Sequence, residues 1–234
     1  MKGASIVVHI LLVEDDPEVA RIIKYYLAQE EQYEITWVRN VHEAVSASRD
    51  CFDIILLDVM LPDGDGISLC AQLRQWHSCP VIFVSCLDDS ESIVSALNQG
   101  GDDFIVKPFN NQVLLARIQA NLRRVQMEHS VVPPNVLACK GFSLDAATHE
   151  LIKNGAREKL SPMEFRILAF FMQNPGRTFK PNELYKLIWG KVDYGDHRTV
   201  IVHIHALRKK IEQDPVNPKY LKSIWGKGYI FEPD

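Results

Sequence analysis

The first half of the chain alternates short apolar runs rich in Val and Ile with segments of helical periodicity. The apolar runs are residues 9–13, 34–38, 53–57, 81–85 and 103–106. The segments between them place apolar residues near i, i+3, i+4 and i+7, a spacing typical of amphipathic helices. Strands that alternate with helices predict an α/β domain with a five-stranded, doubly wound parallel sheet.

The length of 234 residues favours two domains, because single domains usually have roughly 100 to 150 residues. We expect a first domain at residues 1–126, a linker at 127–136 and a second domain at 137–234. Residues 1–126 carry 10 Lys and Arg against 18 Asp and Glu, a net charge of −8, and the rest carry 16 against 12, a net charge of +4. This asymmetry favours a cation or phosphate site in the first domain and a polyanionic partner for the second.

The sequence also indicates the cellular location of the protein. No apolar run approaches the ~20 residues that a helix needs to span a bilayer, and the first apolar stretch ends in Glu14, Asp15 and Asp16 without a cleavage site for a signal peptide. We therefore expect a cytoplasmic protein with no membrane partner. The five cysteines form no CxxC pair and no zinc-ligand spacing, so we interpret them as free thiols.

Polar residues stand where the predicted strands end. Glu14 and Asp15 follow the first strand, Asp58 follows the third, Ser85 ends the fourth, and Lys107 follows the fifth. In doubly wound sheets, ligands bind beyond the carboxyl ends of the strands. One carboxylate there can simply cap the next helix, but Asp15 and Asp58 together repel one another unless a cation lies between them. Hard oxygen ligands of this kind favour Mg²⁺.

This set of side chains suits phosphoryl transfer. It combines a carboxylate nucleophile at Asp58, a cationic side chain at Lys107 and a hydroxyl donor at Ser85. Phosphoryl transfer needs mainly positioning and neutralised charge. The turn LPDGDG after Asp58 exposes the carboxylate, so we predict that Asp58 accepts a phosphoryl group.

The pattern of the second half predicts an α+β unit. Asn154-Gly155 predicts a β-hairpin, and Ser161, Pro162 and Glu164 predict the start of a helix. That helix covers residues 162–174, and two more are expected at 181–190 and near 196–213. Two short strands then surround residues 225–228.

The third of these helices has an apolar face and a polar face. Val200, Ile204, Leu207 and Ile211 are spaced 4, 3 and 4 residues apart, so they share one face. The polar face and its flanks hold Arg198, Thr199, Val202, His203, His205, Ala206, Arg208, Lys209 and Lys210. A charged face is usually only solvated, but this one is followed by a basic hairpin with Lys227 and Tyr229. A helix for the major groove beside such a wing predicts binding of double-stranded DNA.

The motifs resemble a known family. ILLVEDDP, DIILLDVMLPDGDG, the serine of the fourth strand and FIVKPF resemble the receiver domain of bacterial two-component response regulators. LSPMEFRILAFF, ELYKLIW, RTVIVHIHALRKKI and SIWGKGYIF resemble the winged-helix effector domain of the OmpR/PhoB subfamily. The resemblance spans nearly the whole chain, and it implies a CheY-like receiver followed by a winged helix-turn-helix domain.

The resemblance assigns roles around the acceptor. It implies that a sensor histidine kinase phosphorylates Asp58, and that Asp15, Asp58 and the Met60 carbonyl hold Mg²⁺ with Glu14 acting through water. Beyond this phosphorylation and dephosphorylation of itself, the protein is not expected to be an enzyme.

It also implies a conformational switch. Ser85 and Phe104 would form the switch pair, and the peptide bond between Lys107 and Pro108 would be cis. Plain core packing of Phe104 is an equally good interpretation of the sequence.

The resemblance further implies partners for both domains. It gives phosphate contacts to Thr199, His203, Arg208, Lys209 and Tyr229, a base contact to Arg198, and a contact with RNA polymerase to the loop at residues 189–196. His205-Ala206 stands where many relatives have two basic residues, so Val202 and Ala206 are candidates for contact with thymine methyl groups. Homodimer contacts are implied for Asp102, Asp103, Arg117 and Arg124, while Val113 replaces a frequent glutamate.

Together these features predict a phosphorylation-dependent transcriptional regulator that dimerises through its receiver and binds promoter DNA. One alternative is a metal-dependent phosphatase with an aspartyl nucleophile, in which Asp63 or Asp65 would be the general acid; no insertion large enough for a substrate cap is visible. Another is a constitutive DNA-binding protein whose receiver only dimerises.

Overall fold

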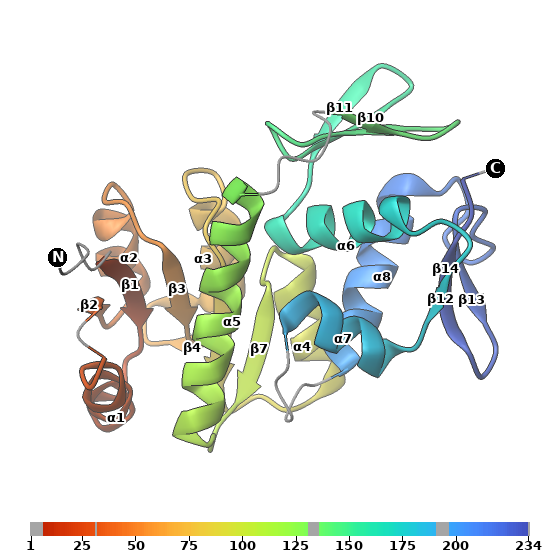
Figure 1. Cartoon of the computed structure of the whole chain (residues 1–234). Coiled ribbons are helices and arrows are strands. Elements are labelled where there is room, and N and C mark those ends of the chain that lie inside the picture. Colours follow the sequence, from red (N-terminus) through yellow and green to blue (C-terminus); the bar gives the residue numbers. More distant parts are fainter. Residues whose placement is uncertain (1–6, 31, 131–135, 191–196, 234) are drawn as a thin grey trace, which may run out of the picture. The chain divides into compact units, whose positions relative to one another are not determined.

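The computed structural model describes residues 7–30, 32–130, 136–190 and 197–233. The chain divides into two compact units, Met1–Val125 and Gln126–Asp234, which Figure 1 colours from red to green and from green to blue. No helix among the described residues combines the length and the apolar character that crossing a bilayer requires.

The first unit is built on a five-stranded parallel sheet with the strand order β2-β1-β3-β6-β7. The chain moves outward from β1 to β2, then returns past β1 to β3, so the strand order reverses beside β1 and a crevice forms at the carboxyl ends of β1 and β3. This is the predicted doubly wound sheet. Its strands are β1 Val8–Val13, β2 Tyr33–Val38, β3 Ile54–Leu57, β6 Val81–Ser85 and β7 Asp103–Val106.

Five helices cover this sheet. Side chains of α1 and α5, such as Ile23 and Ile118, share one core with Ile10 and Ile54 of the strands, and each fully buried Leu or Ile contributes about 1.5–3 kcal/mol. Helix α3 packs against both α2 and α4. Aspartate side chains cap α1, α3 and α4. The helices are α1 Pro17–Leu27, α2 Val41–Ala47, α3 Gly66–Leu73, α4 Ser90–Asn98 and α5 Asn111–Ser130.

Two local features of the first unit differ from the expected pattern. The turn after Asp58 contains a two-stranded hairpin, β4 Met60–Leu61 and β5 Gly64–Asp65, which is too short to leave a periodic signal. Helix α5 continues to Ser130, into the stretch where the sequence places the linker. The next element, β8, begins at Val136.

The second unit opens with a four-stranded antiparallel sheet in the order β11-β10-β9-β8. The turn between β10 and β11 is Asn154-Gly155, with φ of 52° and 79°. Positive φ at both residues is what a tight hairpin turn requires, so the expected hairpin is present. The strands are β8 Val136–Ala138, β9 Ser143–Asp145, β10 Glu150–Lys153 and β11 Ala156–Lys159.

Three helices and a second sheet follow. Helix α6 Pro162–Gln173 starts with the expected capping box between Ser161 and Glu164. Helices α7 Pro181–Trp189 and α8 His197–Ile211 come next, and α8 packs against both α6 and α7. The strands β12 Thr178–Phe179, β13 Leu221–Ile224 and β14 Gly228–Phe231 form a sheet in the order β12-β14-β13. Three helices beside a β-hairpin are the expected winged-helix arrangement.

The hairpin β13–β14 depends on one glycine. Gly228 has φ of 114°, and a Cβ atom at this position would lie 2.0 Å from the carbonyl oxygen of Phe179. A residue with a side chain therefore does not fit here without moving β12.

Candidate functional site

Three carboxylates meet at the carboxyl ends of β1 and β3. Glu14 and Asp15 follow β1, and Asp58 follows β3, where its amide donates to the carbonyl of Val13 at 3.0 Å. Each of the three carboxylates has an oxygen within 4.8 Å of an oxygen of the others. Glu14 and Asp58 are buried, and Asp15 is partly exposed.

Lys107 brings a positive charge to this cluster from the end of β7. Its Nζ donates to Asp58 Oδ2 at 2.6 Å and to the two carboxylate oxygens of Glu14 at 2.7 and 2.8 Å. The peptide bond from Lys107 to Pro108 is cis, as the resemblance implies.

The charges at this cluster do not balance. Burial raises the pKa of Glu14 to about 7, although the hydrogen bond and the charge of Lys107 act to lower it. Burial acts to lower the pKa of Lys107, but the hydrogen bonds to Asp58 and Glu14 outweigh burial and raise it. One ammonium beside three carboxylates leaves an excess of negative charge in a partly buried site. Because hard oxygen ligands with excess negative charge are what Mg²⁺ binds, these residues fit a divalent cation.

Ser85 and Phe104 lie on neighbouring strands behind the cluster. The Ser85 side chain is fully buried, and among the described residues its hydroxyl has no hydrogen-bond partner. Phe104 is 5% exposed, and its ring stacks on Phe83 with 6.1 Å between centroids. Phe104 therefore occupies a core position in this structure.

Gly66 holds the backbone of Asp58 closely. A Cβ atom on Gly66 would lie 1.9 Å from the carbonyl oxygen of Asp58, and the Gly66 amide donates to the carbonyl of Val59 at 2.8 Å. The amide of Met60 donates to Asp58 Oδ1 at 3.1 Å. The short β4–β5 hairpin thereby fixes Asp58 from its carboxyl-terminal side.

An apolar groove of about 410 Å³ lies beside the cluster. Lys107 belongs both to this groove and to the carboxylate cluster, so the groove adjoins Asp58. The groove is lined by Val19, Ile22, Cys86, Lys107, Pro108, Phe109 and Asn111.

Helix α8 exposes only part of the residue set predicted to contact DNA. His205 and Lys209 are exposed, and Arg198 and Arg208 are half-buried. Because α8 packs on both α6 and α7, its buried arc is wider than the apolar stripe alone suggests. Four further residues of the predicted set are buried, which differs from a position facing the DNA groove: Thr199, Val202, His203 and Ala206. Of these, His203 lies against the ring of Trp189, with 5.9 Å between centroids.

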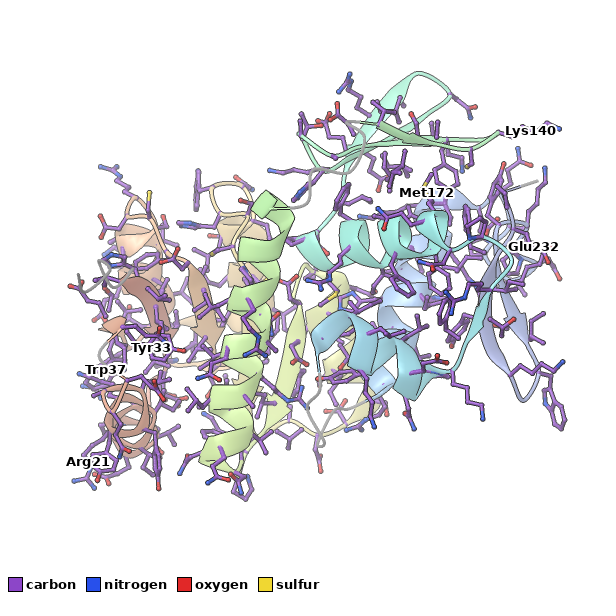
Figure 2. All side chains as sticks on the ribbon, viewed as in Figure 1. Arg21, Tyr33, Trp37, Lys140, Met172 and Glu232 are labelled. Atoms are coloured by element: carbon purple, nitrogen blue, oxygen red, sulfur yellow. The ribbon has the colours of Figure 1, made fainter. Side chains whose placement is uncertain are left out.

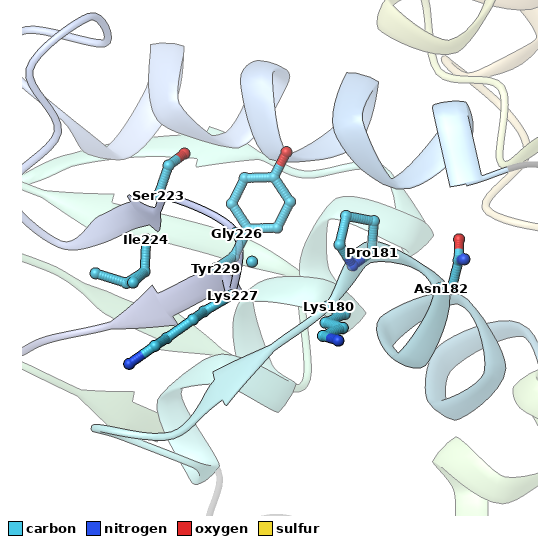
Figure 3. A pocket seen from close by; sticks show the side chains of 9 residues that line it. Lys180, Pro181, Asn182, Ser223, Ile224, Gly226, Lys227 and Tyr229 are labelled. Atoms are coloured by element: carbon cyan, nitrogen blue, oxygen red, sulfur yellow. The ribbon is translucent and has the colours of Figure 1, made fainter.

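The hairpin β13–β14 and the start of α7 enclose a groove of about 490 Å³ with a basic lining (Figure 3). Lys180 and Lys227 contribute charge, Lys227 being exposed, and Tyr229 is half-buried. Lys180 and Lys227 therefore bring two positive charges to the groove between the start of α7 and the hairpin.

Two family models match the chain. "Response regulator receiver domain" matches residues 10–119, and "Transcriptional regulatory protein, C terminal" matches residues 155–231. The chain is 37% identical over 224 residues to the sensory transduction protein RegX3 of Mycobacterium bovis, covering 95% of this chain and 98% of that protein. It is 33% identical over 225 residues to the DNA-binding response regulator MtrA of Mycolicibacterium smegmatis, covering 96% of each. The chain belongs to the response regulators of the OmpR/PhoB subfamily.

A solved structure supports this assignment at the level of the fold. The response regulator DrrB of Thermotoga maritima, described as an OmpR/PhoB homologue, is 30% identical to this chain, covers 97% of it over its own full length, and superposes with a TM-score of 0.51. The first unit of this response regulator is thus a receiver domain, and the second is a transcriptional regulatory domain of the winged-helix type.

The receiver uses Asp63 and Asp65 as helix caps. Asp63 accepts hydrogen bonds from the amides of Val41 and His42 at 2.7 and 3.0 Å, and these bonds, that of Val41 first, hold the pKa of Asp63 below its usual value. Asp65 accepts from the amides of Ile67 and Ser68 at the start of α3. A general acid must carry a proton, so this geometry does not favour the phosphatase alternative.

The residues expected to bridge a receiver dimer are engaged within the protomer. Asp102 is fully buried and pairs with Arg74 at 2.5 Å, and Asp103 is fully buried and pairs with Arg117 at 2.6 Å. Buried charges require such partners, and here a receiver helix supplies each of them. This differs from the intermolecular role that the resemblance implies; the side chain of Arg124 lies outside the described residues.

The loop expected to face RNA polymerase is described only at its first two residues, because residues 191–196 lie outside the described part of the chain. Trp189 is buried and stacks on Tyr185 with 4.9 Å between ring centroids. Its role here is in the core.

Several residues around the sites have structural roles that no sequence motif indicates. Trp37, labelled in Figure 2, donates from Nε1 to the carbonyl of Glu14 at 2.9 Å. A change at the carboxylate cluster should therefore alter the fluorescence of Trp37. Arg74 pairs with the buried Asp102, 28 positions away, and Glu212 accepts from the amide of the buried Leu221, 9 positions away. Gly66 differs from these residues, because the turn DGDG signals it.

Proposed function

We propose that Asp58 is the phosphoacceptor of this receiver and that phosphorylation controls DNA binding by the second unit. The observation that carries the proposal is the contact of Lys107 Nζ with both Asp58 and Glu14 at 2.6–2.8 Å. This contact supports a site prepared to hold a phosphoryl group next to a carboxylate, because the ammonium offsets charge on the incoming oxygens.

The chemistry is a single transfer. An oxygen of the Asp58 carboxylate attacks the phosphorus atom of the donor, and a phosphorus–oxygen bond forms as the bond to the leaving group breaks. The leaving group keeps that electron pair. The donor is a phosphohistidine of a sensor histidine kinase, and the groove beside Lys107 supports docking of a protein next to the acceptor. Lys107 then stabilises the acyl phosphate, and the unpartnered hydroxyl of Ser85 becomes a donor to it.

The metal in this proposal is Mg²⁺, held by Asp15, Asp58 and the Met60 carbonyl, with Glu14 acting through water. When bound, Mg²⁺ neutralises negative charge on the phosphoryl oxygens. The fit rests on the three clustered carboxylates.

The second unit is proposed to bind promoter DNA as part of a homodimer. The exposed residues Lys209 and Lys227, together with Arg198, supply salt-dependent attraction to the duplex. His205 and Tyr229 offer hydrogen-bond donors to it. Receiver phosphorylation needs to favour the dimer by only a few kcal/mol to change DNA occupancy strongly. RNA polymerase is proposed as a further partner on the promoter.

The direct test is labelling with acetyl phosphate and Mg²⁺, followed by intact-mass measurement. We expect one phosphoryl group on the wild-type chain and none on Asp58→Asn. Asp63→Asn is the matched control, because Asp63 lies on the same turn but caps a helix, and it should be labelled normally. Equal labelling of Asp58→Asn and wild type would contradict the proposal.

The regulatory part needs a second measurement. Duplexes are selected from random DNA by the chain with and without acetyl phosphate, and their affinity is compared in both states. We expect phosphorylation to tighten binding in the wild type and to have no effect in Asp58→Asn. A wild-type affinity that does not respond to acetyl phosphate would instead favour the constitutive DNA-binding protein.

A further inference from the structure

Arg208 of α8 points its guanidinium at the hairpin β13–β14. Its Nε donates to the carbonyl oxygen of Leu221 at 2.8 Å, and its Nη2 donates to Ser223 Oγ at 2.8 Å. The guanidinium also lies 5.7 Å from the centroid of the Tyr229 ring. One side chain of α8 thus contacts both strands of the hairpin β13–β14, which is the wing of this winged-helix unit.

Glu212, just after α8, bonds to the same residue of β13, on the edge of the strand that faces away from β14. Its carboxylate accepts the amide of Leu221 at 2.8 Å, and also the amides of Lys219 and Tyr220 at 2.8 and 2.9 Å. The carbonyl of Leu221 therefore bonds to Arg208 while its amide bonds to Glu212. The two side chains clamp the first residue of β13 to the carboxyl-terminal end of α8.

Two side chains of the hairpin, those of Ser223 and Tyr229, are turned toward Arg208. Figure 3 shows the Ser223 hydroxyl and the Tyr229 ring pointing toward the blue helix α8, which agrees with their contacts to Arg208. In the side-on bidentate mode, a guanidinium binds a phosphate through its Nε–Nη2 edge. In this chain the wing occupies that edge.

We propose that Arg208 is a positioning residue, which sets the wing at a fixed place beside α8 and does not itself bind a DNA phosphate. The inference rests on the proposed DNA-binding function and assigns different roles to the basic residues of the second unit. Exposed side chains such as Lys209 and Lys227 contact the duplex, and Arg208 aligns the surfaces that carry them.

The test compares Arg208→Lys with the wild-type full-length chain. Lysine keeps the charge and suffices at many phosphate contacts, but it lacks the planar fork that bonds Leu221 and Ser223. We expect hydrogen exchange of residues 221–231 in the DNA-free protein to become about tenfold faster, as loss of a charged hydrogen bond predicts. Affinity for a duplex selected from random DNA should fall by about tenfold at constant salt.

The matched control is Lys209→Gln, on the same helix turn. It should leave hairpin exchange unchanged, lower DNA affinity, and reduce the slope of log affinity against log salt by about one. Ser223→Ala removes only one acceptor, so it should accelerate hairpin exchange less than Arg208→Lys. The circular dichroism melt of every variant is recorded to establish folding.

A coupling measurement separates positioning from a general loss of stability. Lys227→Gln should lower affinity in the wild-type background and cost clearly less in Arg208→Lys, because a displaced wing has already lost the Lys227 contact. Additive effects, or unchanged hairpin exchange in Arg208→Lys, would overturn the inference. If the wild type binds no duplex, the DNA-binding proposal fails, and the exchange comparison still decides whether Arg208 holds the wing.

Discussion

The ammonium of Lys107 lies between two buried carboxylates, 2.6 Å from Asp58 Oδ2 and 2.7 Å from Glu14 Oε2. Under the proposed function, this ammonium competes with Mg²⁺ for the same oxygens and also prepares the site for a phosphoryl group. Lys107→Met should bind Mg²⁺ more tightly, by about tenfold or ~1.4 kcal/mol, and should be labelled by acetyl phosphate more slowly. Calorimetric titration and the labelling time course measure the two effects.

The control for this prediction is Lys24→Met, since Lys24 lies over the ring of Trp37 and makes no contact with the site oxygens. It should behave like wild type in both measurements. The fluorescence of Trp37, whose indole bonds to the Glu14 carbonyl, gives an independent Mg²⁺ titration. Labelling of Lys107→Met at the wild-type rate would count against a role for this ammonium.

Replacing Ser85 should affect activation and not folding. Its buried hydroxyl has no partner among the described residues, so Ser85→Ala removes an unsatisfied polar group and should leave the free energy of unfolding unchanged or raise it by about 1 kcal/mol. The gain in DNA affinity on phosphorylation should shrink. Ser48→Ala is the control, because that hydroxyl donates to the Val45 carbonyl at 2.6 Å. Equal destabilisation of the two variants in urea would refute the prediction.

Gly66 and Gly64 offer a matched pair next to the acceptor. A methyl group on Gly66 would meet the Asp58 backbone at 1.9 Å, whereas one on Gly64 would meet only the Val41 side chain at 3.0 Å. Backbone cannot yield as a side chain can, so Gly66→Ala should lower the free energy of unfolding by about 2 kcal/mol or more and slow labelling of Asp58. Gly64→Ala should be near wild type in both urea denaturation and labelling.

Local periodicity and topology are the parts of this fold that can be predicted from the sequence. Alternating patterns predict the five βα units, and the rule for strand ends brings Glu14, Asp58 and Lys107 to one edge of the sheet. The ion pair of Arg74 with Asp102 joins residues 28 positions apart, and no local pattern reveals it. Val202 is buried because α8 packs against two helices, α6 and α7. A helical pattern with one apolar and one polar face does not predict this second contact.

We predict that Asp102 stabilises the folded protomer, independently of any role in dimerisation. Its carboxylate accepts from Arg74 at 2.5 Å and from the Val81 amide at 2.8 Å. Asp102→Asn leaves the guanidinium of Arg74, whose side chain is only 14% exposed, without its countercharge, so unfolding should become easier by about 3–5 kcal/mol. Urea denaturation at two protein concentrations checks this, because loss of a dimer contact would depend on concentration and loss of an internal pair would not. The exposed Asp88 is the control position for Asp→Asn.

His77 should make the receiver less stable in mild acid. Its imidazole is buried, with Nε2 2.9 Å from the Ser48 carbonyl, and burial lowers the pKa of His77 below 6.5 while the Ser48 contact acts to raise it. The folded state thus disfavours the proton relative to the unfolded state. This contribution to stability is fully present above pH ~6.5 and is lost as the pH falls through the lowered pKa. Urea midpoints at pH ~7.5 and ~5 should therefore differ more for wild type than for His77→Gln, whereas the exposed His42→Gln should follow wild type. A wild-type pH dependence matching that of His77→Gln would contradict a buried neutral imidazole.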